Sequence, residues 1–183
     1  MEKWIALGII VVVLLYAVSV YNGLVAGRNR VRNAWAQIDV QLKRRHDLIP
    51  NLVEAVKGYM AHERGIFDEI AKARSQAMAA GANVPARAAA ENQLTRSVNS
   101  LMALAEAVPQ LKANENMMSF QEELGSTENR IAFARQFYND AVLDYNTRIA
   151  TVPSSFVAGP FGFQPEPLFA GDATDREAVA AKF

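Results

Sequence analysis

The chain begins with one long apolar stretch that differs from everything after it. No charged residue stands between Trp4 and Gly27, and the run from Ile5 to Tyr16 is almost wholly aliphatic. As a helix rising about 1.5 Å per residue, this stretch reaches roughly 36 Å, enough to cross a hydrocarbon core of about 30 Å. Trp4 at one edge and Tyr16 toward the other suit the two headgroup zones, where amphipathic rings gather. The pattern predicts a transmembrane anchor over residues 1–27.

A cleaved signal peptide is the alternative for this stretch. The segment 17–19, Ala-Val-Ser, loosely resembles a small-residue cleavage site. The residues before the apolar run hold only Lys3, whose charge Glu2 offsets, whereas a signal peptide begins with a clearly basic segment. Helical patterning also continues past Tyr21 without interruption. These features favour an uncleaved anchor.

After the anchor, apolar residues recur every three or four positions, the period of a helix with one buried face. The first stripe begins at the end of the anchor, in the segment 21–49 that we call the neck. It consists of Tyr21, Leu24, Val31, Trp35, Ile38, Leu42 and Ile49. Pro50 then removes an amide donor and its ring collides with the carbonyl of His46, so we expect a break or sharp kink there. Asp47 suits the N-cap of a new helix. The next stripe, Leu52 to Ile70, fades into an alanine-rich run that stops at Gly81.

Further helices are separated by turn-forming residues. Residues 81–85, Gly-Ala-Asn-Val-Pro, combine a glycine after one helix with a proline at the start of the next. A third stripe runs from Leu94 to Val108, a bend follows at Pro109, and a fourth stripe runs from Met117 to Ile149. No stretch alternates as a strand does. The pattern predicts an all-α protein in which residues 28–152 form an elongated bundle of three to four long helices.

Residues 153–183 differ in composition from the helical stripes. Pro153 ends the last helix. Prolines and glycines then alternate with five phenylalanines, namely Phe156, Phe161, Phe163, Phe169 and Phe183. Disordered linkers are poor in aromatic residues, so we expect an extended C-terminal tail that packs its phenylalanines on the bundle like a strap. A partner-binding segment is the alternative.

The charges balance over the chain, 19 basic against 19 acidic residues, which gives no reason to expect nucleic acid as a partner. Their distribution is uneven, because the neck carries a membrane-proximal basic cluster of Arg28, Arg30, Arg32, Lys43, Arg44 and Arg45. Only Lys3 precedes the apolar span, so the positive-inside bias predicts a cytoplasmic bundle. Contact with anionic headgroups is a further expectation for this cluster. A solvated helix face that only sets the topology is the simpler alternative.

The sequence shows no assembled catalytic or metal site. His62-Glu63 begins like the zinc motif HExxH, but Ile66 occupies the position of the second histidine. Neither His46 nor His62 follows a glutamate by three positions, as the di-iron bundle motif requires. The chain also lacks phosphate-binding glycine loops and cysteine. We expect no enzyme, no cofactor, no nucleotide and no bound metal.

Five residues of the neck form an apolar seam that starts at the membrane surface, namely Leu24, Val31, Trp35, Ile38 and Leu42. An apolar seam without cover is unstable in water, and confinement to a bilayer raises the effective concentration of parallel necks. The seam therefore predicts self-association into homo-oligomers. The alternative is that the last helix, Met117 to Ile149, folds back and covers the neck within one chain.

Two Tyr-Asn pairs recur one heptad apart, at residues 138–139 and 145–146, so both tyrosines share one helix face and both asparagines share the next. Asparagines at helix seams commonly fix the alignment of the helices. We interpret the repeat as such a structural device and expect no ligand site from it.

Three runs of the sequence are long and distinctive. They extend from Tyr21 to Tyr59 (YNGLVAGRNRVRNAWAQIDVQLKRRHDLIPNLVEAVKGY), from Thr127 to Asn146 (TENRIAFARQFYNDAVLDYN) and from Gly159 to Phe169 (GPFGFQPEPLF). Together they resemble the LemA family of bacterial membrane proteins. The resemblance implies an N-terminal membrane anchor, a cytoplasmic helical bundle and no established enzymatic reaction. That family includes a protein implicated in building magnetosome membranes, which adds a membrane-organising role to the expectations.

We therefore expect a single-pass protein of the bacterial inner membrane that acts as a scaffold through protein–protein or protein–lipid contacts. Its expected partners are the lipid bilayer, further copies of the chain and a membrane-protein partner. An adaptor or regulator of a membrane enzyme, such as a protease complex, is the alternative. An enzyme whose site assembles only in an oligomer is a more distant third hypothesis.

Overall fold

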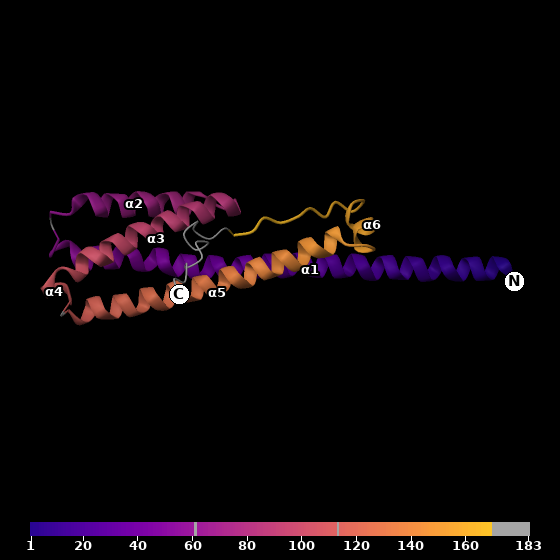
Figure 1. The fold of residues 1–183 in the computed structure, drawn as a ribbon, viewed down its shortest axis with the longest axis horizontal. Helices are drawn as coiled ribbons and strands as arrows, with labels where there is room; N and C mark the ends of the chain where they lie inside the picture. Colours follow the sequence, from indigo (N-terminus) through magenta and orange to yellow (C-terminus); the bar gives the residue numbers. More distant parts are fainter. Residues whose placement is uncertain (61, 113, 170–183) are drawn as a thin grey trace, which may run out of the picture. The chain divides into compact units, whose positions relative to one another are not determined.

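A computed structural model describes residues 1–60, 62–112 and 114–169, and within these ranges every regular element is a helix (Figure 1). The helices are α1 (Glu2–Lys57), α2 (Arg64–Ala79), α3 (Val84–Glu106), α4 (Pro109–Lys112), α5 (Glu115–Ala150) and α6 (Ser154–Ala158). The predicted all-α class, with a long apolar N-terminal helix followed by several long helices, is confirmed. The domain limits at residues 27 and 152 stay predictions.

The chain divides into two compact units, which we describe separately. The first unit joins residues 1–38 to residues 134–168, and the second contains residues 39–133 with Phe169. Two helices, α1 and α5, therefore contribute a part to each unit.

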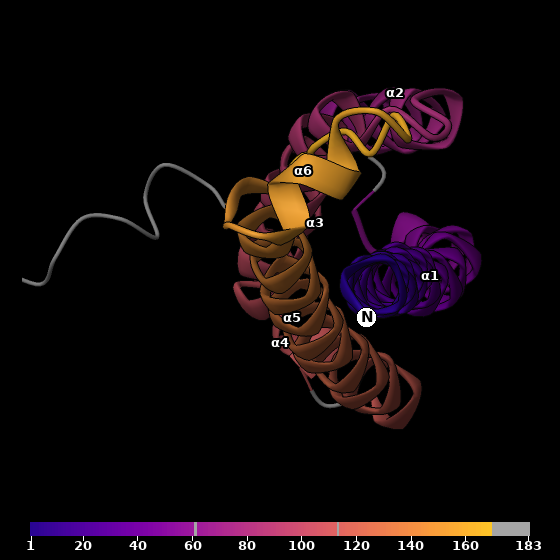
Figure 2. The same ribbon diagram turned by 90° about the vertical axis from the view of Figure 1, so that its right-hand side faces the viewer.

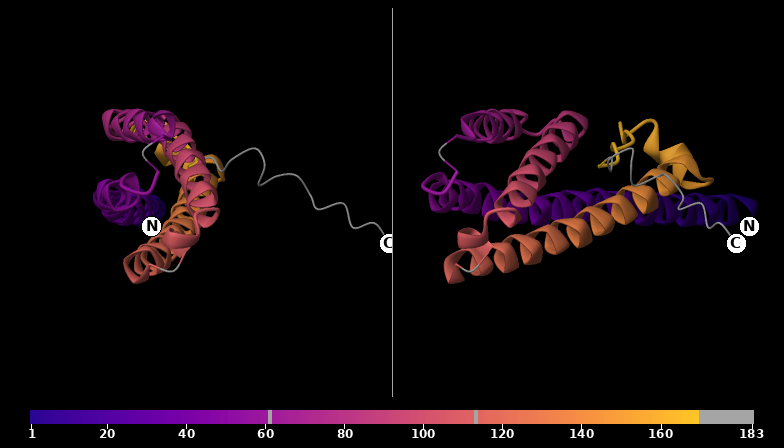
Figure 3. Two further views of the ribbon diagram at one scale, coloured as in Figure 1. Left: turned by 90° about the vertical axis from the view of Figure 1, so that its left-hand side faces the viewer. Right: turned by 60° about the vertical axis from the view of Figure 1, so that its left-hand side comes forward.

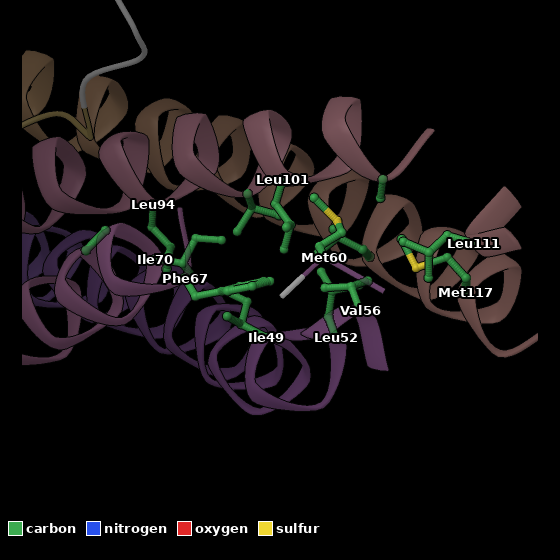
Figure 4. Close-up of a cluster of buried hydrophobic side chains, with 14 of the residues drawn as sticks. Ile49, Leu52, Val56, Met60, Phe67, Ile70, Leu94, Leu101, Leu111 and Met117 are labelled. Atoms are coloured by element: carbon green, nitrogen blue, oxygen red, sulfur yellow. The ribbon is translucent and has the colours of Figure 1, made fainter. Parts of the chain in front are cut away.

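In the second unit, α2 and α3 lie side by side (Figure 3). The last turns of α1, both of these helices and the start of α5 bury their apolar faces in one core, shown in Figure 4. Its labelled members are Ile49, Leu52, Val56, Met60, Phe67, Ile70, Leu94, Leu101, Leu111 and Met117. Burial of each leucine or isoleucine side chain contributes about 2 kcal/mol to folding. The apolar stripes that predicted helices thus supply this core.

Of the break or sharp kink expected at Pro50, the break is absent, because α1 continues through this residue to Lys57. A proline inside a helix leaves the carbonyl four residues before it without its usual amide donor. Here that carbonyl belongs to His46, and the Arg74 side chain of α2 donates its Nε–H to it at 2.9 Å. The tertiary contact replaces the missing helical hydrogen bond to the His46 carbonyl.

The helical pattern is interrupted instead between Lys57 and Arg64. The amides of Tyr59 and Met60 both donate to the Val56 carbonyl, at 3.0 and 3.1 Å, and so close the last turn of α1. Gly58 lies at this point, and glycine destabilises a helix interior by about 0.5–1 kcal/mol relative to alanine. The expectation of one helix through the stripe from Leu52 to Ile70 is therefore wrong.

The turn predicted at residues 81–85 is confirmed. Gly81 has a φ of +58°, in the left-handed region that glycine adopts without strain. The Asn83 side chain caps α3 by accepting a hydrogen bond from the amide of Ala86 at 3.0 Å, and Pro85 lies in the first turn. The bend predicted at Pro109 is confirmed as well, since α4 begins there and α5 follows.

In the first unit, the C-terminal part of α5 runs antiparallel to α1. Tyr145 lies against Gly27, where an added Cβ would meet its ring at 3.4 Å. Further along α1, the ring of Trp35 lies 5.5 Å from that of Tyr138. Between these two contacts the residue number rises on α1 and falls on α5, so the two helices run antiparallel.

The predicted tail differs at its beginning, because residues 154–158 form the short helix α6 at the end of α5 (Figure 2). An extended segment then leads to Phe169. Phe163 and Phe169 are buried, as expected for a strap, whereas Phe156 and Phe161 are exposed. Phe183 lies outside the described residues.

Candidate functional site

The first functional element is the apolar N-terminal part of α1. An 18-residue window of this helix is apolar enough to cross a membrane, and none of it is buried in the described structure. The core helix of a soluble protein passes the same composition test but is mostly buried. The exposed apolar surface therefore fits one candidate membrane span near the N-terminus.

The second element is a pair of side chains that holds the tail, and we call it the tail clamp: Tyr138 and Asn146 of α5. The Tyr138 hydroxyl donates to the carbonyl of Pro167 at 2.8 Å. The Asn146 side chain makes two bonds with the backbone of Glu166: its amide donates to the carbonyl, and its oxygen accepts from the N–H, each at 2.9 Å. A single asparagine thus pairs with the tail as a neighbouring strand would.

Burial raises the pKa of Tyr138 to about 12, and the negative charge of Glu166 adds to this effect. Burial raises the pKa of Tyr145 as well. The Tyr138 hydroxyl therefore keeps its proton, and with it the hydrogen bond to the tail, well into the alkaline range. The interpretation of the Tyr-Asn repeat as a device for aligning helices stays a prediction, and one residue of each pair holds the tail in addition.

Replacing Asn146 with alanine should free the tail, since both bonds to the Glu166 backbone are lost. At about 1 kcal/mol for each hydrogen bond, the loss of both bonds should make the amide protons around Glu166 exchange with solvent roughly thirtyfold faster. Hydrogen exchange read by mass spectrometry measures this change. Asn29→Ala, at an exposed position of α1, is the control and should leave the tail peptide unaffected. Equal exchange in both variants would contradict the clamp.

The third element is an aromatic cluster where the tail meets α1. The ring of Tyr21 lies 5.0 Å from that of Phe161 and 5.6 Å from that of Phe163. The guanidinium carbon of Arg28 lies 5.1 Å from the centroid of the Phe163 ring, within cation–π range. These contacts attach the tail to the part of α1 that directly follows the apolar span.

The fourth element, in the second unit, is a buried ionic cluster of Arg45, His46 and Glu91. The guanidinium of Arg45 donates to the Glu91 carboxylate, and its Nη1 donates to Thr95 at 2.7 Å and to Glu128 at 2.9 Å. His46 places its Nε2 3.1 Å from the same Glu91 carboxylate. The Arg45 and Glu91 side chains are 2% and 4% exposed, so two charges are buried as a pair.

Two opposing effects set the pKa of Glu91. Its burial disfavours the carboxylate, whereas the hydrogen bond to His46 and the positive charge of Arg45 favour it and outweigh burial, so the pKa is lowered. The carboxylate is thus ionised, with the Arg45 and His46 side chains beside it. Among the residues that the structure describes, no group of three or more histidine, aspartate or glutamate side chains is placed to hold a metal ion.

Comparison with known proteins adds the family to this geometry. The model of the family described as LemA matches residues 34–183, which is most of the chain. This chain belongs to the LemA family. The resemblance noted in the three runs of sequence is confirmed.

Individual LemA relatives are distant. Magnetosome protein MamQ 2 of Paramagnetospirillum magneticum is 24% identical over 174 residues, covering 81% of this chain and 64% of that protein. Magnetosome protein MamQ of Magnetospirillum gryphiswaldense is 24% identical over 169 residues, covering 79% and 62%. Protein LemA of Metamycoplasma hominis is 23% identical over 158 residues, covering 86% and 72%. The chain thus spans a little less than two thirds of the length of these MamQ proteins.

The tail clamp and the aromatic cluster connect the three runs that resemble LemA. The first run supplies Tyr21 and Arg28, the second supplies Tyr138 and Asn146, and the third contributes the tail. Each run contacts at least one of the others in the first unit. The three runs that resemble the family, of which residues from 34 onward are matched by the family model, therefore meet in the first unit.

The predicted basic cluster of this LemA chain is not one free surface. In the first unit, Arg30 pairs with Asp144 at 3.4 Å, and in the second unit Arg44 pairs with Glu123 at 2.9 Å. Arg45 belongs to the buried ionic cluster and is closed to lipid headgroups. The side chains of Arg32 and Lys43 are exposed. Contact of the remaining basic residues with lipid stays a prediction.

The predicted self-association seam is covered within the single LemA chain. Its four aliphatic residues are at most 3% exposed, namely Leu24, Val31, Ile38 and Leu42. Trp35 is half-buried, and its ring lies against that of Tyr138 of α5. The intramolecular cover that the sequence left as an alternative is thus present. Self-association stays a prediction, but an uncovered seam is no longer a reason for it.

The buried ionic cluster was not predicted, although the sequence contains a signal for it. Glu91 follows Ala88 and precedes Leu94 by three positions each, so it lies on the apolar face of α3. A glutamate on an apolar stripe requires a buried cation. Which of the many arginines supplies it is fixed only by the packing of α1 against α3.

Proposed function

We propose that the protein is a membrane-anchored helical scaffold that acts through protein–protein or protein–lipid contacts and not through catalysis. The observation that supports the proposal is the wholly exposed apolar window of α1, which continues without interruption into the packed helices. An exposed apolar surface of this size has its free-energy minimum in a bilayer. The packed helices are then held at the membrane surface, where they can organise other molecules.

The names of the relatives agree with a role in membrane organisation, since two of them are magnetosome proteins. We propose that role for this chain itself. It is not transferred from the activity of the whole MamQ proteins. We further propose the bacterial inner membrane as the location, with the helical units on the cytoplasmic side. The support is the group of basic residues Arg28, Arg30 and Arg32, which closely follows the span.

Anchoring is tested by alkaline extraction of membranes that contain the protein. The expected result is that the protein stays in the pellet, because alkali removes peripheral proteins but not a spanning helix. Mass spectrometry of the pelleted protein should recover the peptide that contains Trp4 and Tyr16. Release into the supernatant, or a mature protein that lacks the residues before Ser19, would contradict the anchor.

Orientation is tested separately on intact spheroplasts. Added protease should leave the helical units uncut, since they face the cytoplasm in this proposal. Permeabilised spheroplasts serve as the control and should show cleavage. Cleavage before permeabilisation would reverse the orientation and leave the anchor itself intact.

An adaptor for a membrane protein is the second candidate, favoured by one observation in the second unit. A mostly apolar cavity of about 270 Å³ opens between α1 and α2 and is lined by Ile49, Pro50, Val53, Glu54, Phe67, Ile70, Ala71 and Arg74. A cavity of this kind accepts an apolar side chain of a partner. Purification from solubilised membranes separates the two functions: one stoichiometric foreign protein, lost in a Val53→Arg variant, favours the adaptor.

A further inference from the structure

The register between α5 and α1 places the end of α5 beside the end of the apolar span. Tyr145 lies against Gly27, and the two helices run antiparallel. Five residues later α5 reaches its last residue, Ala150, and five residues earlier on α1 is Asn22. The same helical rise, about 1.5 Å per residue, applies to both helices. The end of α5 is therefore level with Asn22.

Residues after α5 stay at this level. The ring of Phe161 lies 5.0 Å from the ring of Tyr21, and α6 lies between α5 and this contact in the chain. Figure 1 shows α6 at the end of α5, and from this level toward the N-terminus α1 continues alone. From Trp4 to Tyr21 the helix rises about 26 Å, close to the thickness of a hydrocarbon core. A bilayer around the span thus brings its headgroup zone to Tyr21 and to the turn that contacts it.

This turn exposes large apolar side chains. Val152 is 71% exposed, Phe156 73% and Phe161 64%, and we call these three residues the interfacial turn. In water such a grouping raises the free energy of the protein and usually marks an interaction surface. The other two tail phenylalanines described, Phe163 and Phe169, are buried. The tail therefore divides its aromatic residues between the protein interior and one exposed turn.

We propose that the interfacial turn inserts into the headgroup zone of the bilayer face from which α1 emerges, as a second lipid contact that does not span the membrane. The proposal rests on the proposed anchoring by α1. Lipid is the occupant because the turn is continuous with the span through Tyr21 and lies at the depth where aromatic side chains partition favourably. Arg28, seven residues after Tyr21, lies at the polar edge of the same zone, above the ring of Phe163.

The turn is also attached firmly enough to act as a membrane contact. The tail clamp fixes the residues that follow it, through Asn146 and Tyr138. The end of α5 fixes the residues that precede it. The exposed side chains are thus presented from a turn that is held on both sides, so insertion orders few additional residues.

The test uses the absence of cysteine in the chain. Single variants Phe156→Cys, Phe161→Cys and Phe137→Cys of the full chain are labelled with an environment-sensitive fluorophore. They are reconstituted in vesicles of phosphatidylcholine with a minority of phosphatidylglycerol. Phe137 is the matched control, because it is an exposed phenylalanine on α5 of the same unit, 46% exposed. It precedes the end of α5 by about 20 Å of helix.

The expected result is a shift of the emission to shorter wavelength at positions 156 and 161, with quenching by lipids that carry a nitroxide near the headgroup. Position 137 should report water and show no such quenching. An aqueous signal at positions 156 and 161 would overturn the inference and leave their side chains available for a protein partner. Flotation and alkaline extraction of the same vesicles keep the two proposals apart. Retained protein with aqueous probes refutes only the turn, whereas released protein refutes the anchor and the inference with it.

Discussion

Replacing Glu91 with glutamine is expected to lower the free energy of unfolding by about 3 kcal/mol, the loss typical of a buried ion pair deprived of one partner. The Arg45 side chain is only 2% exposed and stays charged, since guanidinium does not lose its proton in proteins. Glu128 remains beside it, but that carboxylate is 34% exposed and compensates only part of the loss. Unfolding of the full chain by guanidinium chloride in detergent micelles, followed by circular dichroism, measures the change in the free energy of unfolding.

The matched control is Glu123→Gln. Glu123 pairs with Arg44 at 2.9 Å, a normal ion-pair distance, but both side chains are 42% exposed. Water and salt screen such a pair, so the expected loss is below about 1 kcal/mol. Equal losses in the two variants would show that burial does not set the strength of the pair.

The same carboxylate predicts a dependence on pH. The pKa of Glu91 is lowered in the folded protein from its ordinary value of 4.5. A lowered pKa means that ionisation stabilises the fold above the ordinary value, and that this contribution is lost as the pH falls through the lowered value. The stability difference between the wild type and Glu91→Gln should therefore be constant near neutrality and shrink below about pH 4.5. A constant difference throughout the acid range would contradict this assignment.

Replacing Arg74 with methionine is expected to cost about 2 kcal/mol, because it leaves the His46 carbonyl without the charged donor that now binds it at 2.9 Å. The apolar part of the side chain is kept, so the loss reports mainly the hydrogen bond. Lys57→Met is the control: it removes an exposed ion pair with Glu54 and should cost below about 0.5 kcal/mol. Unfolding in detergent micelles provides both values.

A double-mutant cycle with Pro50→Ala tests the reason for this contact. Alanine at position 50 has an amide that can donate to the His46 carbonyl, as in an uninterrupted helix. The cost of Arg74→Met should then fall by about 1 kcal/mol in the Pro50→Ala background. Purely additive losses would mean that the arginine stabilises the protein in another way.

Much of the helical arrangement followed from local rules. Apolar periodicity located the helices, and the glycine-to-proline turn at residues 81–85 has the capping that its residues predict. The error at Pro50 has a different origin. A local rule states what proline removes from its own helix, but the group that compensates lies on α2, which comes later in the chain. A hydrogen-bond donor that comes from a distant part of the chain cannot be recognised from the residues around the proline.

Some functional elements could be predicted from the sequence and others could not, for a related reason. The apolar span is a property of composition and can therefore be predicted from the sequence alone. Asn146 was noticed, but its partner is the backbone of Glu166, which has no side-chain signature. The seam of the neck was identified correctly as apolar, yet periodicity alone cannot state whether its cover comes from the same chain or from a copy. Such questions depend on tertiary packing.

The carbonyl that Pro50 sets free also restricts how the protein can misfold. Inside a regular helix the carbonyls are alike, because each is occupied by the amide four residues later. Pro50 makes the His46 carbonyl different from its neighbours on α1, and one arginine of α2 recognises it. A shift of α2 by one helical turn would separate this donor from its acceptor while leaving the apolar contacts roughly balanced. The proline thus widens the free-energy gap between the native alignment and its shifted competitors.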